Sequence, residues 1–280
     1  MPMEELHQQV ATLMRGVAAD VVMPRFRTLT AHDVSDKGAG EIVTCADFDA
    51  EAALRDGLDR LGIGARIVGE EACASDPALL DGIGEGLVWL IDPLDGTANF
   101  AAGRSPFGMM IALVEDGVPV AGWILDPLSD RLCAAMRGKG ATLDGVTARV
   151  RDESTSPGIA ALGTQFMSAL GRTAVHDAAE RHFLLESIPR CAAESYARLV
   201  LGRNDAAMFQ RILPWDHAAG ILFLTEAGGV ATHWDGAPYR VGSSSAGVLL
   251  ANSLKAHAVM RDALSPLLLA EPVAPDLVTA

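Results

Sequence analysis

Two aspartates stand three positions apart where an apolar run ends, in the stretch WLIDPLDGTANF at residues 89–100. Asp92 follows directly on residues 88–91, which are apolar like a buried strand, and Asp95 comes after Pro93 and Leu94. Two like charges at about 4 Å repel by roughly 1 kcal/mol in bulk water and by about 4 kcal/mol near a protein surface. We therefore expect a cation to compensate them.

Four more acids stand where apolar elements begin or end, namely Asp47, Glu70, Glu71 and Asp216. For Asp47 a capping box with Thr44 is a simpler explanation, and Asp216 suits a helix start. Acids at the ends of buried strands are nevertheless costly unless they face a site. Oxygen ligands of this kind, together with water and phosphate oxygens, are those that Mg²⁺ prefers. The acids together predict a magnesium site.

The residues around the two aspartates also suit phosphate. Pro93 fixes its φ angle and has no N–H to satisfy, while Gly96 allows a sharp turn, so that the N–H groups of Gly96 and Thr97 can point at an anion. Four carboxylates and a phosphate dianion carry about −6, which two or three Mg²⁺ would offset with about +4 to +6. The histidines form no HxxxH or HxH pattern, so zinc is not indicated, and only His217 adjoins a predicted ligand.

The composition restricts the classes of function. A chain of 280 residues can bury roughly three quarters of its extended surface, enough for one large domain or two closely packed halves. Its 22 Lys and Arg against 36 Asp and Glu give a net charge of −14 and a pI of about 4.8. This argues against a nucleic acid polymer or an anionic membrane surface as the main partner, although a small anion can still bind locally.

The compartment is expected to be the cytoplasm. Four cysteines show no CxxC and no spacing typical of metal ligands, which favours buried, reduced thiols: Cys45, Cys73, Cys133 and Cys191. The first residues do not resemble a signal peptide, and no stretch of 18 uncharged apolar residues occurs.

Apolar periodicity predicts alternating helices and strands, and hence α/β layers. Helices are expected at residues 3–23, 45–61, 177–186, 194–201, 214–227 and 254–264, with an exposed loop at 25–41. Strands are expected at residues 42–44, 66–69, 87–92, 109–114, 118–125, 159–162, 206–209 and 247–251. We expect residues 1–280 to form one unit, with a packing boundary near residue 150 between the halves 1–150 and 151–270, and a frayed tail at 271–280.

Three motifs together resemble those of the inositol monophosphatase family: Glu70 in GEE, WLIDPLDGTANF and PWDHAAGILFLTEAGG. The resemblance in order and spacing extends from about Val43 to Ala251. This family comprises lithium-sensitive, Mg²⁺-dependent phosphatases and also includes fructose-1,6-bisphosphatases and bisphosphate nucleotidases. The resemblance implies a five-layer αβαβα sandwich, commonly a homodimer, that hydrolyses a small phosphorylated metabolite with two or three Mg²⁺ and is inhibited by lithium.

The resemblance also implies a role for each acid. The first metal would be held by Glu70, Asp92 and the backbone carbonyl of Leu94, the second by Asp92, Asp95 and Asp216, and a weaker third would lie near Glu70 through waters. Asp47 and Thr97 resemble the pair that orients and deprotonates the attacking water, and the amides of Gly96 and Thr97 would hold the phosphate. Hydrolysis by metal-activated water needs no covalent intermediate.

Specificity is where the chain departs from the family pattern. Inositol-selective members have an Arg-x-x-Gly-Ser/Thr-Ala stretch and often a glutamate seven residues before the last metal aspartate. Here the stretch is RCAAES at residues 190–195, and Phe209 takes the place of the glutamate. An apolar ring accepts no hydrogen bonds from a polyol, so selectivity for myo-inositol 1-phosphate is not expected. The candidate substrate-binding residues are Arg190, Glu194 and Phe209, although Glu194 equally suits an exposed helical acid.

Other functions are open alternatives. Histidinol phosphate, a 3′(2′),5′-bisphosphate nucleotide or another sugar phosphate could be the substrate. A haloacid-dehalogenase-type phosphatase places its two aspartates two positions apart, whereas Asp92 and Asp95 are three apart; Asp47 and Asp49 have that spacing, but Glu51 stands where a hydroxyl or β-branched residue is expected. A protein that keeps the fold without turnover is disfavoured because every predicted ligand and water-activating residue is present.

Overall fold

Residues 87–92, 109–114 and 118–125 form strands that are mostly apolar on both faces, so helices must cover both faces of their sheet. The computed structural model describes residues 2–38, 41–151 and 157–270, and it joins these strands into one seven-stranded sheet of order β3-β4-β5-β6-β7-β8-β9. Neighbouring strands are antiparallel except for the parallel pair β3 and β4. The strands are β3 (Arg66–Gly69), β4 (Leu87–Asp95), β5 (Gly108–Glu115), β6 (Val118–Asp126), β7 (Arg131–Met136), β8 (Gly140–Leu143) and β9 (Val146–Ala148).

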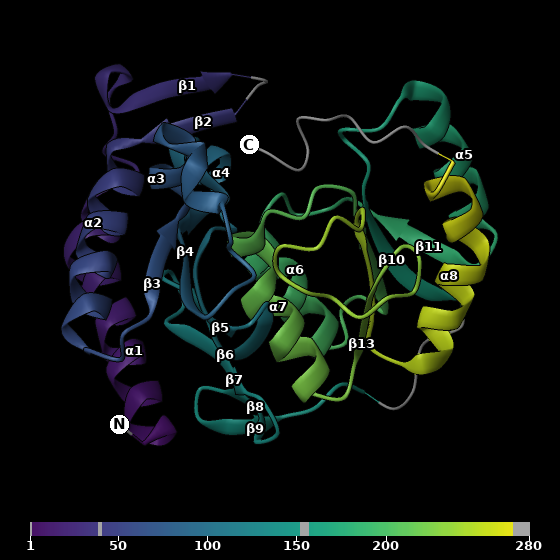
Figure 1. Cartoon of the computed structure of the whole chain (residues 1–280). Helices are drawn as coiled ribbons and strands as arrows, with labels where there is room; N and C mark the ends of the chain where they lie inside the picture. The colour runs from purple at the N-terminus through teal and green to yellow at the C-terminus, as the bar shows by residue number, and fades with distance from the viewer. Residues whose placement is uncertain (1, 39–40, 152–156, 271–280) are drawn as a thin grey trace.

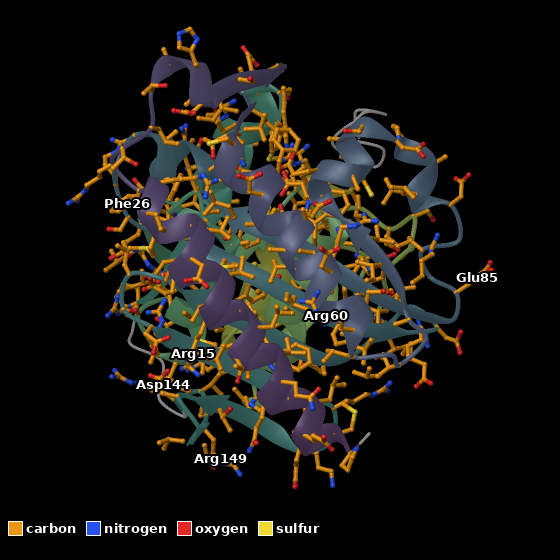
Figure 2. The ribbon with its side chains drawn as sticks, turned by 90° about the vertical axis from the view of Figure 1, so that its left-hand side faces the viewer. Arg15, Phe26, Arg60, Glu85, Asp144 and Arg149 are labelled. Carbon is orange, nitrogen blue, oxygen red and sulfur yellow. The ribbon has the colours of Figure 1, made fainter. Side chains whose placement is uncertain are left out.

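Two long helices, α1 (Met3–Val17) and α2 (Cys45–Arg60), cover one face of this sheet. Trp89 and Ile91 of β4 and Trp123 of β6 are buried in the core beneath them. Figure 2 faces this side of the molecule and shows the two helices next to each other, with Arg15 and Arg60 labelled on them. The alternation of β4 therefore places odd-numbered residues toward α1 and α2.

The opposite face of the sheet is covered by α6 (Ala192–Val200) and α7 (Pro214–Glu226) from the second half of the chain. Leu90 of β4 and Met110 of β5 belong to this core, together with Phe223 of α7. At Gly122 a Cβ atom would lie 2.9 Å from the Cα of Ala219, so the absence of a side chain lets α7 approach β6 closely.

A five-stranded sheet lies on the other side of α6 and α7, and its strand order is β11-β10-β12-β14-β13. Its strands are β10 (Gly158–Gly163), β11 (Phe183–Glu186), β12 (Ala206–Phe209), β13 (Val230–His233) and β14 (Val248–Ala251). Ala207 and Leu250 face α6 and α7, whereas Met208 and Leu249 face α5 (Ala169–Glu180) and α8 (Leu254–Leu268). The resulting layers, α1/α2, sheet, α6/α7, sheet, α5/α8, confirm the predicted five-layer αβαβα sandwich (Figure 1).

The small elements gather at one end of the large sheet. They are the hairpin β1 (Val34–Gly38) and β2 (Glu41–Thr44), and the short helices α3 (Glu70–Ser75) and α4 (Thr97–Ala101). Figure 1 shows them together at the top of the molecule, above the ends of β3 and β4. Within the described ranges, no helix is both long and apolar enough to cross a bilayer.

Two sequence predictions are wrong. Residues 25–41, expected to be an exposed loop, contain a turn of 3₁₀ helix at Ala31–Asp33 and the strand β1. Residues 177–186, expected to be a helix, contain the end of α5 and the strand β11, which pairs in parallel with β10. In both places tertiary pairing outweighs the local pattern.

Other boundaries shift by less. The helix predicted at residues 3–23 is α-helical to Val17 and continues as a wider π turn at Ala18–Val22, and residues 271–280, predicted to be frayed, lie outside the described residues. Three of the cysteines, Cys73, Cys133 and Cys191, are buried as predicted, and Cys45 is half-buried.

Candidate active site

The parallel pairing of β3 and β4 brings the first two acids together. Gly69 is in register with Ile91, so Glu70 and Asp92 follow at the same end of adjacent strands. Asp216 reaches the same place from the first turn of α7. One carboxylate oxygen from each of these three residues lies within 4.8 Å of the others. Segments more than 100 residues apart in the chain thus bring three of the predicted metal ligands together.

Asp95 approaches from a bulge in the same strand. The register of β4 against β5 shifts between Asp92 and Asp95, and the Oδ1 of Asp92 accepts a hydrogen bond from the N–H of Leu94 at 3.0 Å. The Oδ2 of Asp95 accepts a short bond of 2.6 Å from the N–H of Ala193, in the first turn of α6. Asp95 is therefore oriented by the second half of the chain.

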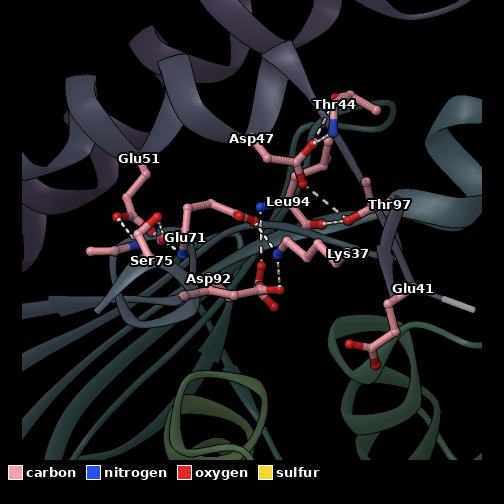
Figure 3. A network of polar contacts seen from close by, with 12 residues as sticks. Lys37, Glu41, Thr44, Asp47, Glu51, Glu71, Ser75, Asp92, Leu94 and Thr97 are labelled. Carbon is pink, nitrogen blue, oxygen red and sulfur yellow. Dashed lines mark hydrogen bonds and ion pairs between the residues drawn. The ribbon is translucent and has the colours of Figure 1, made fainter. Parts of the chain in front are cut away.

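A second group of residues surrounds Asp47 (Figure 3). Its Oδ2 accepts bonds from the N–H and the hydroxyl of Thr44, at 2.8 and 2.6 Å, which is the predicted capping box of α2. Its Oδ1 faces the hydroxyl of Thr97 at 3.0 Å, and that hydroxyl also lies 2.9 Å from the carbonyl oxygen of Leu94. One oxygen of the Asp47 carboxylate thus forms the helix cap, and the other faces Thr97, its partner in the predicted water-activating pair.

The turn between β4 and α4 depends on Gly96. Its φ of +82° is in the left-handed region, and a Cβ atom would lie 3.0 Å from the carbonyl oxygen of Pro106. Asn99 holds the turn against two other loops, because its Nδ2 donates to the carbonyl oxygens of Pro106 and Pro189. This tight turn brings Thr97 back toward Leu94 and Asp47.

Burial and mutual repulsion raise the pKa values of the clustered acids. The pKa of Asp92 and that of Asp216 lie well above their usual range, because their loss of contact with water disfavours the ionised forms and both face other acids, Glu70 among them. Burial also raises the pKa of Asp95, although the amide of Ala193 opposes it. For Asp47 burial raises the pKa to about 6, against the effect of the Thr44 hydrogen bonds.

A cation from the hairpin already meets this group of acids. The Nζ of Lys37, on β1, lies 3.0 Å from Oε1 of Glu70 and 2.7 Å from Oε1 of Glu71. The charges of Glu70 and Glu71 raise the pKa of Lys37 even though its burial alone would lower it. One ammonium does not balance Glu70, Glu71, Asp92, Asp95 and Asp216.

These observations test whether the donors fit a metal. The converging groups are carboxylate oxygens from three separate elements, and the nearby Lys37 shows that positive charge is favourable there. Hard oxygen donors of this kind suit Mg²⁺. His217, beside Asp216, does not join them: its Nδ1 faces the hydroxyl of Tyr196 at 2.8 Å and its Nε2 the carbonyl of Arg211 at 3.1 Å.

The candidate substrate residues lie in different environments. Arg190 is exposed, just before α6. The ring of Phe209 is half-buried and stacks on Tyr196, with centroids 6.4 Å apart. One interpretation of Glu194, an exposed helical acid, is wrong, because this residue is only 8% exposed. Its carboxylate is paired with three arginines: Arg131 at 2.8 Å, Arg198 at 2.9 Å and Arg203 at 3.6 Å.

The sequence patterns do not reveal the residues that contact or support the predicted metal ligands. Lys37 fell in the segment predicted to be a loop, and Glu51 was considered only as a mismatch to another family. Glu41 of β2 forms an ion pair with Arg211, which joins the hairpin to the segment before α7. No local pattern marks such contacts, because each joins residues far apart in the chain.

Comparison with known proteins gives the class. A model of the inositol monophosphatase family matches residues 3–267. The inositol-1-monophosphatase of Caulobacter vibrioides is 33% identical over 234 residues, which are 79% of this chain and 85% of that protein. The Nus factor SuhB of Escherichia coli (strain K12) is 31% identical over 223 residues, 78% of this chain and 82% of that protein.

A solved structure of inositol monophosphatase from Anabaena (Nostoc) sp. PCC 7120 has the same fold, with a TM-score of 0.72 and 26% identity over 99% of this chain and 100% of that one. Fold, acid cluster and relatives together define a phosphoric monoester hydrolase. The chain belongs to the inositol monophosphatase family, which is generally metal-dependent. The predicted family and enzyme class are therefore confirmed.

Proposed function

We propose that this protein hydrolyses a small phosphate monoester with Mg²⁺ and a directly attacking water. The observation that carries the proposal is the convergence of Glu70, Asp92 and Asp216 within 4.8 Å, next to the Asp47 and Thr97 pair. Two or three Mg²⁺ would be held by these acids, Asp95 and the carbonyl of Leu94. Bound there, the metal would neutralise the acids and make water and phosphorus more reactive.

Two side chains of the site would then move one proton, and two backbone amides would hold one anion. Thr97 would orient the attacking water, and Asp47 would take its proton through the Thr97 hydroxyl, 3.0 Å away. A base whose pKa lies near 6 is mostly ionised at neutral pH and so can accept that proton. The amides of Gly96 and Thr97 would hold the phosphate oxygens. Because water attacks phosphorus, no aspartate becomes phosphorylated.

For the natural substrate we propose a class of compounds and not a single one. Phe209 supplies no acceptor for ring hydroxyls, and Glu194 is already bound by arginines, which supports a monoester other than myo-inositol 1-phosphate. Histidinol phosphate, a bisphosphate nucleotide and other sugar phosphates are the candidates. We further propose a cytoplasmic homodimer that lithium inhibits, with a packing boundary near residue 150, as the family resemblance and the sequence pattern indicate.

A phosphate-release screen with Mg²⁺ tests the proposal. The panel contains inositol 1-phosphate, histidinol phosphate, adenosine 3′,5′-bisphosphate and fructose 1,6-bisphosphate. The variant Asp92→Asn removes the central charge at nearly constant shape, and we expect activity to fall more than about 100-fold, the most that loss of an indirect metal contact usually costs. Asp59→Asn, at the exposed end of α2, is the matched control and should keep wild-type activity.

Two results would contradict the proposal. Activity of Asp92→Asn close to that of the wild type would show that the acid cluster is not the metal site. Failure of the wild type to release phosphate from any compound, with Mg²⁺ present and the protein folded, would favour a binding protein that keeps the fold without turnover.

A further inference from the structure

A buried glutamate on α2 is bonded to the start of the helix that carries Glu70. Glu51 is 4% exposed and lies one helical turn after Asp47, on the same side of α2. Its Oε2 accepts the N–H of Glu71 at 2.7 Å and its Oε1 accepts the N–H of Ala72 at 3.0 Å (Figure 3). Each carboxylate oxygen thus binds a different amide in the first turn of α3.

These amides have no cap of the ordinary kind. The first N–H groups of a helix lack partners within it and are usually bonded by the side chain before the helix. Here that position is Gly69, which has no side chain. Glu51 supplies the acceptors from another helix, and its negative charge suits the positive end of α3.

Gly69 also provides the space that Glu51 needs. A Cβ atom at this position would lie 2.2 Å from Cδ of Glu51 and 2.3 and 2.5 Å from its two oxygens. Its φ of −110° is ordinary for any residue, so the backbone conformation does not require glycine here. The close approach of the carboxylate is what requires it.

We propose that Glu51 is a positioning residue for the metal site, a proposal that rests on the function proposed above. Glu70 is the first residue of α3, so the turn that Glu51 holds sets where the Glu70 carboxylate lies relative to Asp92 and Asp216. Glu51 does not itself bind the metal, because its two oxygens face the amides of Glu71 and Ala72 and it is not among the acids that converge with Asp92 and Asp216. It sets the affinity for metal, whereas Asp47 on the same helix face acts on water.

Calorimetric titration with Mg²⁺ alone tests this role. Glu51→Gln keeps the shape but replaces one acceptor oxygen with an NH₂ group that opposes an amide N–H. We expect its dissociation constant for Mg²⁺ to rise about tenfold, the lower end for groups that support metal ligands, while kcat at saturating Mg²⁺ stays within about threefold of the wild type. Asp56→Asn removes the same charge from an exposed site on the same helix and should bind Mg²⁺ normally.

The outcomes separate this proposal from the one beneath it. If the wild type binds no Mg²⁺, the proposed function fails first. If the wild type binds Mg²⁺ and a folded Glu51→Gln binds it equally tightly, only the positioning role is overturned. A lower melting temperature of Glu51→Gln with unchanged Mg²⁺ affinity likewise overturns it, because the residue would then act on stability alone.

A double-mutant cycle gives a second test that does not depend on glutamine. Gly69→Ala places a methyl group against the carboxylate and should weaken Mg²⁺ binding severalfold in the wild-type background. In the Glu51→Ala background the space is free, so the same change should have little further effect. Equal effects of Gly69→Ala in both backgrounds would show that Gly69 and Glu51 act independently, which contradicts the proposal.

Discussion

Asp92 and Glu194 are both buried acids, yet their neighbours give them opposite properties. Burial and the nearby acids raise the pKa of Asp92, so its ionised form requires compensation of the kind that the proposed metal would supply. Burial alone would also raise the pKa of Glu194, but hydrogen bonds from Arg131 and Arg198 outweigh it and lower that pKa. Because Glu194 already has its cations, we expect substrate choice to depend more on Phe209.

Replacement of Phe209 by glutamate tests that expectation. A carboxylate here would supply the acceptor that inositol-selective relatives have, and a hydrogen bond to a charged group contributes about 1.5–3 kcal/mol. We expect Phe209→Glu to raise kcat/KM for inositol 1-phosphate relative to the best other monoester by at least about tenfold. The measurement is phosphate release from the two substrates under identical Mg²⁺.

Phe209→Leu serves as the control for this change. It removes the stacking on Tyr196 without adding an acceptor, so the ratio between the two substrates should stay close to that of the wild type. If glutamate and leucine give the same ratio, residue 209 does not select the substrate.

At the scale of the helices and strands, sequence patterns predicted those elements whose ends are decided by residues nearby in the chain. The strands predicted at residues 109–114 and 118–125 and the helix predicted at 214–227 match β5, β6 and α7 to within one residue at each end, because turn and cap residues such as Gly117 and Gly228 act within a few positions. The strand β11 was predicted to be helical because nothing near Leu184 shows that β10 lies beside it. Pairing partners that are distant in sequence decide such segments.

The close contact between α6 and α7 predicts how a substitution at Gly220 changes the stability of the protein. Gly220 of α7 faces Tyr196, and a Cβ atom there would lie 2.0 Å from Cδ2 of that ring. Alanine favours a helix by about 1 kcal/mol over glycine, whereas overpacking a core costs about 1–3 kcal/mol. The ring is fully buried and cannot move aside, so the cost should outweigh the gain, and we expect Gly220→Ala to lower the free energy of unfolding by up to about 2 kcal/mol.

Urea unfolding measures this change, and Gly16→Ala is the matched control. Gly16 lies on α1, is exposed and has nothing within 4 Å of its would-be Cβ atom. There the helix preference acts alone and should raise the free energy of unfolding by up to about 1 kcal/mol. The interpretation of the α6 and α7 contact is wrong if both variants are stabilised.

At the scale of the whole molecule, the candidate site is assembled from both halves of the chain. Asp92 lies in the large sheet and Glu70 begins α3 directly after β3 of that sheet, while Asp216 and the amide that orients Asp95 come from α7 and α6. The motifs identified the acids because residue type and spacing along the chain are enough to recognise a possible set of metal ligands. They could not identify Lys37, Glu51 or Ala193, whose contributions depend on distances that only the folded chain defines.

This assembly predicts how metal, pH and stability are linked. Without metal, the folded-state pKa values of Asp92, Asp95 and Asp216 are raised, so the folded protein holds protons that the unfolded chain releases. Stability without metal should therefore fall as the pH rises above about 4, the ordinary value of a carboxyl group, and through the raised values. Mg²⁺ binds the ionised carboxylates, so its stabilising effect should grow over the same range.

Thermal unfolding with Mg²⁺ and with EDTA, from about pH 5 to pH 8, checks this linkage. A ligand at 100 times its dissociation constant stabilises by about 2.7 kcal/mol, which for a chain of this size corresponds to an increase in Tm of about 5 °C. We expect that increase near pH 8 and less than half of it near pH 5, where protons compete with Mg²⁺. Asp92→Asn should show little increase at either pH. If Mg²⁺ raises the Tm of the wild type equally at pH 5 and at pH 8, the metal does not bind these carboxylates.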